Sequence, residues 1–471
     1  MSVAQGEAPV RGKKAAAVRA WLWPTRTARQ KALIHARRWH GVPVSDDLPV
    51  TLKGMKFRQV LALLARLVVH SKWTWIFLIL LAGYAACGLV VYFDLGATQT
   101  YEDGSFVPGL NDDALVQSAK YALPTLAFWT ILYLLIDRFR PQRLIVWALA
   151  LGWGGLAAMC FSLYANTWAA SQMAVLGLAP GMSDPRPAIY IAPFIEEASK
   201  GTILFIIAFL ARDRIVSAVS GVVLGALAGA GFAFSENIVY YARAIVYGSY
   251  TASTGDLQAA VRELVLLRGL YTCFGHPTFT AMIGLGLAVG VRHRSKIVRV
   301  IAPAAGFLAA ALLHMLFNGI SSIVSGDALI YVYLLFGLPF AIGTLILVIR
   351  TAVRQARLIR ERLGDYVVMG WLPQRYPALF ASLKNRIWSL LMSPWYGSVI
   401  ATWRLQQAVT ELAYLRDRVT RGVVGDGGRE RERELIGVIR RARAAKGLET
   451  AAGLRPYLWR RKTRPVVTAG A

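Results

Sequence analysis

The chain has 471 residues, of which 56% are hydrophobic and only 17% are charged, and its mean hydropathy is +0.46. A soluble protein of this length needs far less apolar material for its core, so the composition favours a membrane protein. The formal net charge of +27 would suit a nucleic-acid-binding protein, but no recognition motif accompanies it, and we expect no specific nucleic-acid partner. Lys and Arg instead gather at the two ends and in short loops, as expected beside an anionic inner leaflet.

The first 72 residues are basic and precede every long apolar run. A secretory signal would place its apolar segment much earlier, so we expect a basic cytoplasmic arm over residues 1–72 and no cleaved signal peptide. The three cysteines, Cys87, Cys160 and Cys273, all lie in apolar runs and suggest neither a disulfide framework nor a metal site.

Eight apolar runs approach or exceed the roughly 20 residues that cross a bilayer as a helix. They lie at residues 73–93, 121–136, 144–165, 188–210, 215–247, 264–291, 300–323 and 328–349. The loops at 137–143, 211–214 and 291–299 are basic, whereas the loop at 94–113 is acidic. The positive-inside rule then places the basic loops and both termini in the cytoplasm. We therefore predict an all-α, polytopic cell-membrane protein with about eight transmembrane helices in residues 73–350.

The segment at residues 351–471 is basic and moderately polar. Residues 398–419 and 429–445 carry apolar side chains at helical spacing, with a Gly-rich turn at 424–428 between them. No catalytic spacing appears there, so we predict a cytoplasmic helical hairpin rather than a catalytic domain.

Ionisable side chains occur well inside only four consecutive spans. At about 1.5 Å per residue, one residue of each span comes out roughly 14 to 18 Å from the outer end, near the middle of a core about 30 Å thick. Charged groups inside a membrane face a protein interior or a water-filled cavity, so their shared depth predicts one functional site. The ionisable residues are Glu196, Glu197, Lys200, Glu236, Arg268, His276 and His314.

Local spacing refines this site. Glu196 and Lys200 are four residues apart and share a helix face, whereas Glu197 points about 100° away and is expected to be free to act elsewhere. Pro193, one turn earlier, is expected to bend the helix at the site. Pro277, next to His276, removes the helical partner of the Cys273 carbonyl.

Three further residues suggest support for the site. Asn237 directly follows Glu236, and Asn318 lies four residues after His314 on the same helix face. The glycines at positions 221, 225 and 229 form a doubled GxxxG stripe, which predicts close packing against a neighbouring helix.

The chain has no GxSxG nucleophile, no GxGD-type aspartate pair and no HExxH zinc motif in these spans. Two chemistries remain: a water activated by a glutamate, or a metal ion held by Glu and His side chains. Because no compact two-ligand motif is present, we favour a glutamate base without a cofactor and keep zinc as the alternative. Glu and His chains also carry protons in ion-coupled transporters, which is the second functional hypothesis, although no internal repeat supports it.

Four segments resemble the PrsW-type intramembrane proteases, which are distantly similar to CAAX-processing endopeptidases. They are EEASK (196–200), FAFSEN (232–237), GHPTFTAMIGLGLAVG (275–290) and HMLFN (314–318), and the resemblance covers residues 187–322. Pro277 departs from the family, in which a small residue more commonly follows the first histidine.

The resemblance implies hydrolysis of a peptide bond in a membrane protein, such as a membrane-anchored regulator. It implies that Glu196 or Glu197 activates water, with facing arguments favouring Glu197, and that Glu236 assists. His276 and His314 would stabilise the oxyanion or protonate the leaving amine, and Lys200, Asn237 and Asn318 would orient these groups. The substrate and the oligomeric state do not follow from the sequence.

Overall fold

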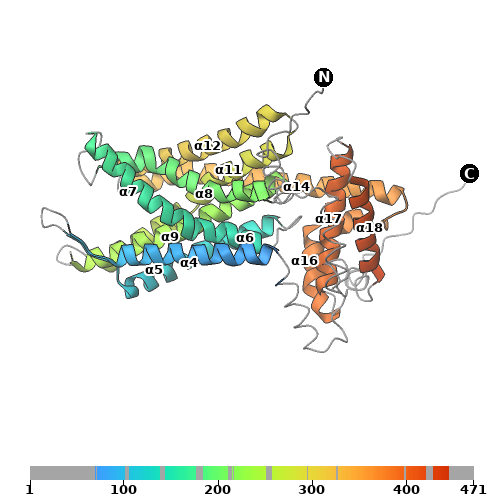
Figure 1. Ribbon diagram of the computed structural model, residues 1–471, viewed down its shortest axis with the longest axis horizontal. Coiled ribbons are helices and arrows are strands. Elements are labelled where there is room, and N and C mark those ends of the chain that lie inside the picture. Colours follow the sequence, from blue (N-terminus) through green and yellow to red (C-terminus); the bar gives the residue numbers. More distant parts are fainter. Residues whose placement is uncertain are drawn as a thin grey trace, which may run out of the picture. The chain divides into compact units, whose positions relative to one another are not determined.

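The computed structural model describes most of the chain between residues 69 and 444 (Figure 1). The described residues are 69, 72–100, 106–137, 144–176, 184–210, 215, 217–250, 257–293, 295–324, 327–396, 399–420 and 428–444. The predicted N-terminal arm, apart from residues 69 and 72, the basic loops at 138–143 and 211–214, and most of the Gly-rich turn lie outside this set.

The N-terminal half of the bundle begins with two 25-residue helices, α4 (Lys72–Gly96) and α5 (Asp112–Ile136). Between them, β1 (Gln99–Thr100) pairs in antiparallel fashion with β2 (Phe106–Val107). Asn111 caps α5, because its side chain accepts a hydrogen bond of 2.8 Å from the backbone N–H of Ala114. A long helical stretch follows as α6 (Leu144–Gly152), the π-helical turn η2 (Trp153–Ala158) and α7 (Met159–Val175).

The site helices come next. The π-helical turn η3 (Pro187–Ile191) leads into α8 (Ala192–Leu210), and α9 covers Ala218–Tyr250. Helix α10 (Leu257–Leu266) and the turn η5 (Leu267–Tyr271) end before a short break, after which α11 covers Gly275–Arg292. Helix α12 (Lys296–Ile323) follows, and the bundle closes with α13 (Asp327–Val332), η6 (Tyr333–Gly337) and α14 (Leu338–Val368).

Seven helices within the described residues are long and apolar enough to cross a membrane. They account for seven of the eight predicted spans. The remaining span falls on α8, which is 19 residues long and contains Glu196, Glu197 and Lys200. The all-α, polytopic architecture is therefore confirmed, and the predicted span that is not among the seven is the one with the most charged residues of the predicted site.

The described part of the C-terminal tail is also helical. Its elements are α15 (Tyr376–Phe380), α16 (Leu383–Met392), the 3-10 turn η7 (Ser393–Tyr396), α17 (Val399–Thr420) and α18 (Gly428–Ala444). The chain divides into two compact units, and residues 389–396, 399–405 and 436–444 belong to the smaller one. In the larger unit, Arg431 of α18 pairs with Glu411 of α17 at 2.9 Å. Both segments predicted to be amphipathic are helices.

Helices α9 and α11 pack so closely that their backbones are in contact, and this contact positions the site. The predicted glycine stripe of α9 faces α11, so that prediction is confirmed. No side chain would fit there: an added Cβ would lie 2.2 Å from the carbonyl oxygen of Gly284 at Gly221, 2.4 Å from that of Thr280 at Gly225, and 2.3 Å from that of His276 at Gly229.

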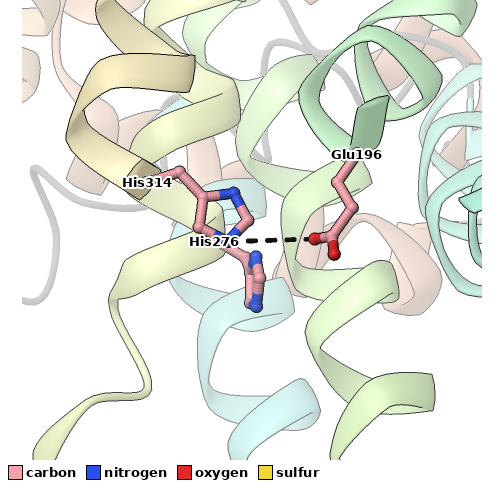
Figure 2. Close-up of side chains that lie close together, drawn as sticks. All are labelled: Glu196, His276 and His314. Carbon is pink, nitrogen blue, oxygen red and sulfur yellow. Dashed lines mark ion pairs between the residues drawn. The ribbon is translucent and has the colours of Figure 1, made fainter. Parts of the chain in front are cut away.

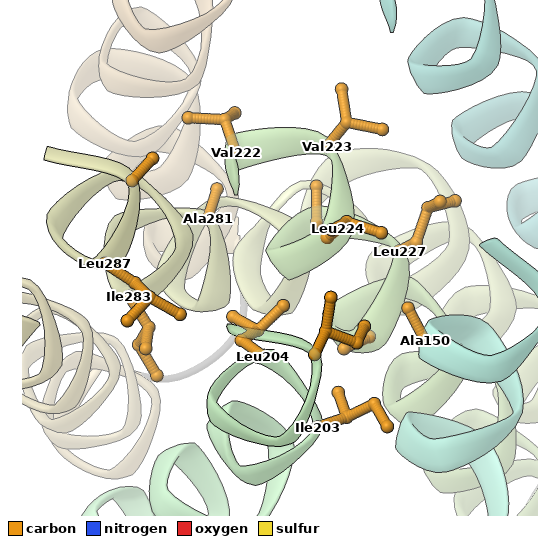
Figure 3. Close-up of a cluster of buried hydrophobic side chains, with 14 of the residues drawn as sticks. Ala150, Ile203, Leu204, Val222, Val223, Leu224, Leu227, Ala281, Ile283 and Leu287 are labelled. Carbon is orange, nitrogen blue, oxygen red and sulfur yellow. The ribbon is translucent and has the colours of Figure 1, made fainter. Parts of the chain in front are cut away.

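The apolar core lies around the same helices. Figure 3 shows side chains of α6, α8, α9 and α11 converging, among them Leu204, Leu224 and Ile283, which are 0–1% exposed. This dense core holds α8 and α11 against α9, so the polar residues on these helices have fixed positions.

Candidate active site

Helices α8, α9, α11 and α12 bring the predicted polar residues into direct contact. Glu196, Glu197 and Lys200 come from α8 and are buried. Glu236 comes from α9, His276 from the first turn of α11, and His314, which is 2% exposed, from α12. Residues up to 118 positions apart in the chain thus form one hydrogen-bonded network, as the shared depth of the spans predicts.

Glu197 is fully buried and both of its carboxylate oxygens are engaged. Lys200 Nζ lies 2.7 Å from Oε1, and His314 Nδ1 lies 3.1 Å from the same oxygen. The Thr280 hydroxyl donates a hydrogen bond of 2.8 Å to Oε2. The expectation that Glu197 would be free is therefore wrong. Glu197 and Lys200 are three residues apart, and this spacing also places two side chains on one helix face. Lys200 Nζ therefore lies closer to Glu197 Oε1 than to Glu196 Oε2, from which it is separated by 3.4 Å.

Glu236 has a similar role beside the other histidine. His276 Nε2 lies 2.7 Å from Glu236 Oε2, and Arg268 Nη2 donates to the same oxygen at 2.7 Å. Arg268 Nε also donates to Asn237 Oδ1 at 2.8 Å, and its guanidinium lies 3.8 Å from the centre of the Tyr240 ring. The turn η5 thus brings a cation to the carboxylate that holds His276.

Glu196 has weaker contacts and is turned toward the two histidines. Its Oε2 lies 3.8 Å from His314 Nε2, the contact drawn as a dashed line in Figure 2. Its Oε1 accepts a hydrogen bond of 3.2 Å from Asn166 Nδ2 of α7. Oε2 also lies 3.4 Å from Lys200 Nζ. Both oxygens of Glu196 thus have partners, but at longer distances than the contacts of Glu197.

The hydrogen bonds assign the tautomers of the two histidines. A carboxylate can only accept, so the proton of His314 lies on Nδ1, facing Glu197, and that of His276 lies on Nε2, facing Glu236. The lone pairs of His314 Nε2 and His276 Nδ1 are left on the side of Glu196. His276 Nδ1 lies 3.1 Å from Lys200 Nζ, and the two rings are perpendicular with centroids 5.0 Å apart.

This donor set fits a divalent metal ion. One ligand atom from each of Glu196, His276 and His314 lies within 4.8 Å of the other two. Two histidines and one glutamate form a known ligand set of catalytic zinc, and each histidine is held by a carboxylate through its other nitrogen, as metal ligands usually are. The network has three carboxylates but only two cationic side chains, Lys200 and Arg268, so a further cation would balance its formal charge.

The start of α11 explains how His276 reaches the site. The helix begins at Gly275, so Pro277 lies in the first turn, where a missing N–H costs the helix little. The carbonyl of Cys273, predicted to lose its partner, belongs to the break before α11. On α8, Pro193 is the second residue, directly after the π-helical turn η3.

The two predicted asparagines lie at the edge of the network. Asn237 binds Arg268, as described above. Asn318 Nδ2 donates a hydrogen bond of 2.9 Å to the backbone carbonyl of Ala188 in η3, and so connects α12 to the segment before α8. The i, i+4 spacing of His314 and Asn318 therefore does not bring the two side chains to one partner.

Two residues in contact with the site were not identified from the sequence. Asn166 and Thr280 are uncharged, and a search for ionisable residues within apolar runs passes over them. Thr280 does lie four residues after His276, on the same helix face, which was a usable signal. Asn166 belongs to a helix without any ionisable residue near the site depth, so only its polarity in an apolar run marks it.

Comparison with known proteins supports the resemblance. Residues 140–344 match the family model described as PrsW family intramembrane metalloprotease. No curated protein and no solved structure matches the chain. The matched residues include α6 to α13 and every residue of the polar network. The chain is thus similar to the PrsW family of intramembrane proteases over residues 140–344.

Proposed function

We propose that the chain hydrolyses a peptide bond of a membrane-associated protein, and that Glu196, His276 and His314 form the centre at which this occurs. One observation carries the proposal: three side chains from three helices turn ligand atoms toward one space, while a second carboxylate, Glu197 or Glu236, holds each histidine from behind. Such precise support is typical of a site that must hold a reactive geometry. Packing alone does not require it.

A divalent metal ion, with zinc as the first candidate, would be held by the Glu196 carboxylate, His276 Nδ1 and His314 Nε2. When bound, it would supply Lewis-acid activation of water and of the scissile carbonyl. The tautomers favour this over a glutamate base acting alone, because neutral histidines with lone pairs toward Glu196 cannot donate to an oxyanion. The donor geometry thus reverses the preference that we drew from the sequence.

The protein groups around this centre have separate roles. Glu197 and Glu236 fix the orientation and tautomer of His314 and His276. Lys200 compensates the charge of the paired glutamates, and Arg268 does so for Glu236. Glu196, whose contacts are longer than those of Glu197, would be the carboxylate that holds the ion. We therefore assign the acting carboxylate to Glu196 and not to Glu197.

The proposed substrate is a membrane protein, because three of the four site helices, α9, α11 and α12, are long and apolar enough to span a bilayer. The test uses purified full-length protein in lipid nanodiscs and a single-pass substrate labelled at both ends. Glu196→Gln should lower kcat/KM by about 10² or more. Glu263→Gln, on the exposed surface of α10, is the matched control and should leave cleavage unchanged. Equal cleavage by wild type and Glu196→Gln would contradict the proposal.

A further inference from the structure

Asn166 of α7 is the polar group that contacts Glu196 from outside the four site helices. Its Nδ2 donates a hydrogen bond of 3.2 Å to Glu196 Oε1. The other oxygen of the same carboxylate, Oε2, faces His314 at 3.8 Å and lies 3.4 Å from Lys200 Nζ. A donor on Oε1 therefore fixes the rotation of the carboxylate and leaves Oε2 directed at the histidines.

The position of Asn166 on α7 is consistent with this contact. Ser162 and Ala169, four residues before and three residues after it, are 2% and 5% exposed and form the buried stripe of the helix. Phe161 and Trp168, on another face, are 63% and 65% exposed. Asn166 thus lies on the side of α7 that packs against α8.

The hydrogen bonding of Asn166 is unbalanced in a way that argues against a purely structural role. Its Oδ1 is buried and has no hydrogen-bond partner within the part of the chain that the structure describes. A buried amide with only one group satisfied stabilises less than an apolar side chain of similar size would. A residue that lowers the stability of the fold at its own position is typical of functional sites.

We propose that Asn166 is a positioning residue, which holds the Glu196 carboxylate as Glu197 holds His314 and Glu236 holds His276. Each of the three groups at the centre then has a hydrogen-bonding partner that orients it from a position away from the shared space. This inference rests on the proposed function, because it assigns Asn166 to the hydrolytic centre, and it adds α7 to the helices that build that centre.

The test compares Asn166→Leu, which removes the donor at similar size, with Asn166→Asp, which keeps the shape and replaces the donor with a second carboxylate. Thr167→Leu is the matched control, because Thr167 is the next residue on α7, is exposed, and bonds only the carbonyl of Leu163 on its own helix. Full-length proteins in nanodiscs are compared for zinc affinity, measured by competition with a chelating dye, and for kcat, KM and thermal unfolding.

We expect Asn166→Leu and Asn166→Asp to weaken zinc binding and to lower kcat by about 10- to 100-fold, with KM within about twofold of wild type. The thermal midpoint of Asn166→Leu should stay the same or rise. Asn166→Gln, which keeps an amide donor, should recover part of the lost kcat, and Thr167→Leu should behave as wild type.

Two results overturn the inference. Unchanged zinc affinity and kcat in Asn166→Leu would show that Glu196 needs no partner on α7. Failure of both the Leu and the Asp variant to fold would show that Asn166 acts in helix packing. If the wild type neither binds zinc nor cleaves the substrate, the proposed function itself is contradicted, which is a different outcome from an active wild type with an equally active Asn166→Leu.

Discussion

Glu197 Oε1 lies 3.1 Å from His314 Nδ1, and this contact turns the other nitrogen of the histidine toward Glu196. Adjacent residues on α8 therefore have different surroundings. Glu197 is enclosed by Lys200, Thr280 and His314, whereas Oε2 of Glu196 makes longer contacts with Lys200 and His314. Under the proposed function, this difference explains why two carboxylates stand side by side in an apolar helix: one belongs to the centre and the other orients a histidine of that centre.

The first prediction separates these two glutamates. Glu197→Gln should lower kcat/KM by about 10- to 100-fold, because the amide weakens the support of His314 without removing a group from the centre. Glu196→Gln should cost more, about 10² or more, because it removes the acting carboxylate. Both variants are compared by cleavage of the same single-pass substrate. A larger loss from Glu197→Gln than from Glu196→Gln would reverse our assignment.

The second prediction concerns the contact between α9 and α11. A Cβ at Gly225 would lie 2.4 Å from the carbonyl oxygen of Thr280, whose hydroxyl binds Glu197. Gly225→Ala should therefore destabilise the bundle by about 1–3 kcal/mol and lower activity, and the larger change Gly225→Leu should do so more strongly. Thermal unfolding and cleavage assays measure the two effects.

Gly83→Ala is the control for this change, because an added Cβ on α4 would meet nothing within 4 Å. Alanine also has the higher helix propensity, so Gly83→Ala should be neutral or slightly stabilising. Full stability and activity in Gly225→Ala would show that α9 and α11 do not pack as closely as the structure indicates.

The third prediction concerns topology, which rests on the charges of the loops. In a variant without its native cysteines, a cysteine at Asp113, exposed at the start of α5, should react with an impermeant thiol reagent added outside the cell. A cysteine at Lys296, exposed at the start of α12, should react only after the membrane is permeabilised. The reverse pattern of labelling would place the basic loops outside.

Much of the bundle could be predicted because a bilayer imposes simple rules on a sequence. The length of the apolar runs predicted the transmembrane spans, and the spacing of the glycines on α9 predicted its close contact with a neighbouring helix, which is α11. The cost of burying charge led to Glu196, Glu236, His276 and His314 as one group, because residues that are expensive in a membrane tend to serve a common purpose.

Side-chain partnerships were harder to predict. Helical spacing allowed Lys200 to pair with either glutamate, and only the packed structure shows that Glu197 is the nearer. The contact between Asn166 and Glu196 joins helices 30 residues apart, and no local pattern encodes it. The tautomers of the histidines follow from such partnerships, so the balance between a glutamate and a metal mechanism could not be drawn from spacing alone.

The most direct test measures metal content and peptide cleavage on the same purified, full-length protein. We expect wild type to retain about one zinc ion per chain, His314→Ala to retain almost none, and a chelator to abolish cleavage until zinc is added back. Full cleavage of the substrate by protein that has been stripped of metal and kept in chelator would contradict a metal centre at Glu196, His276 and His314.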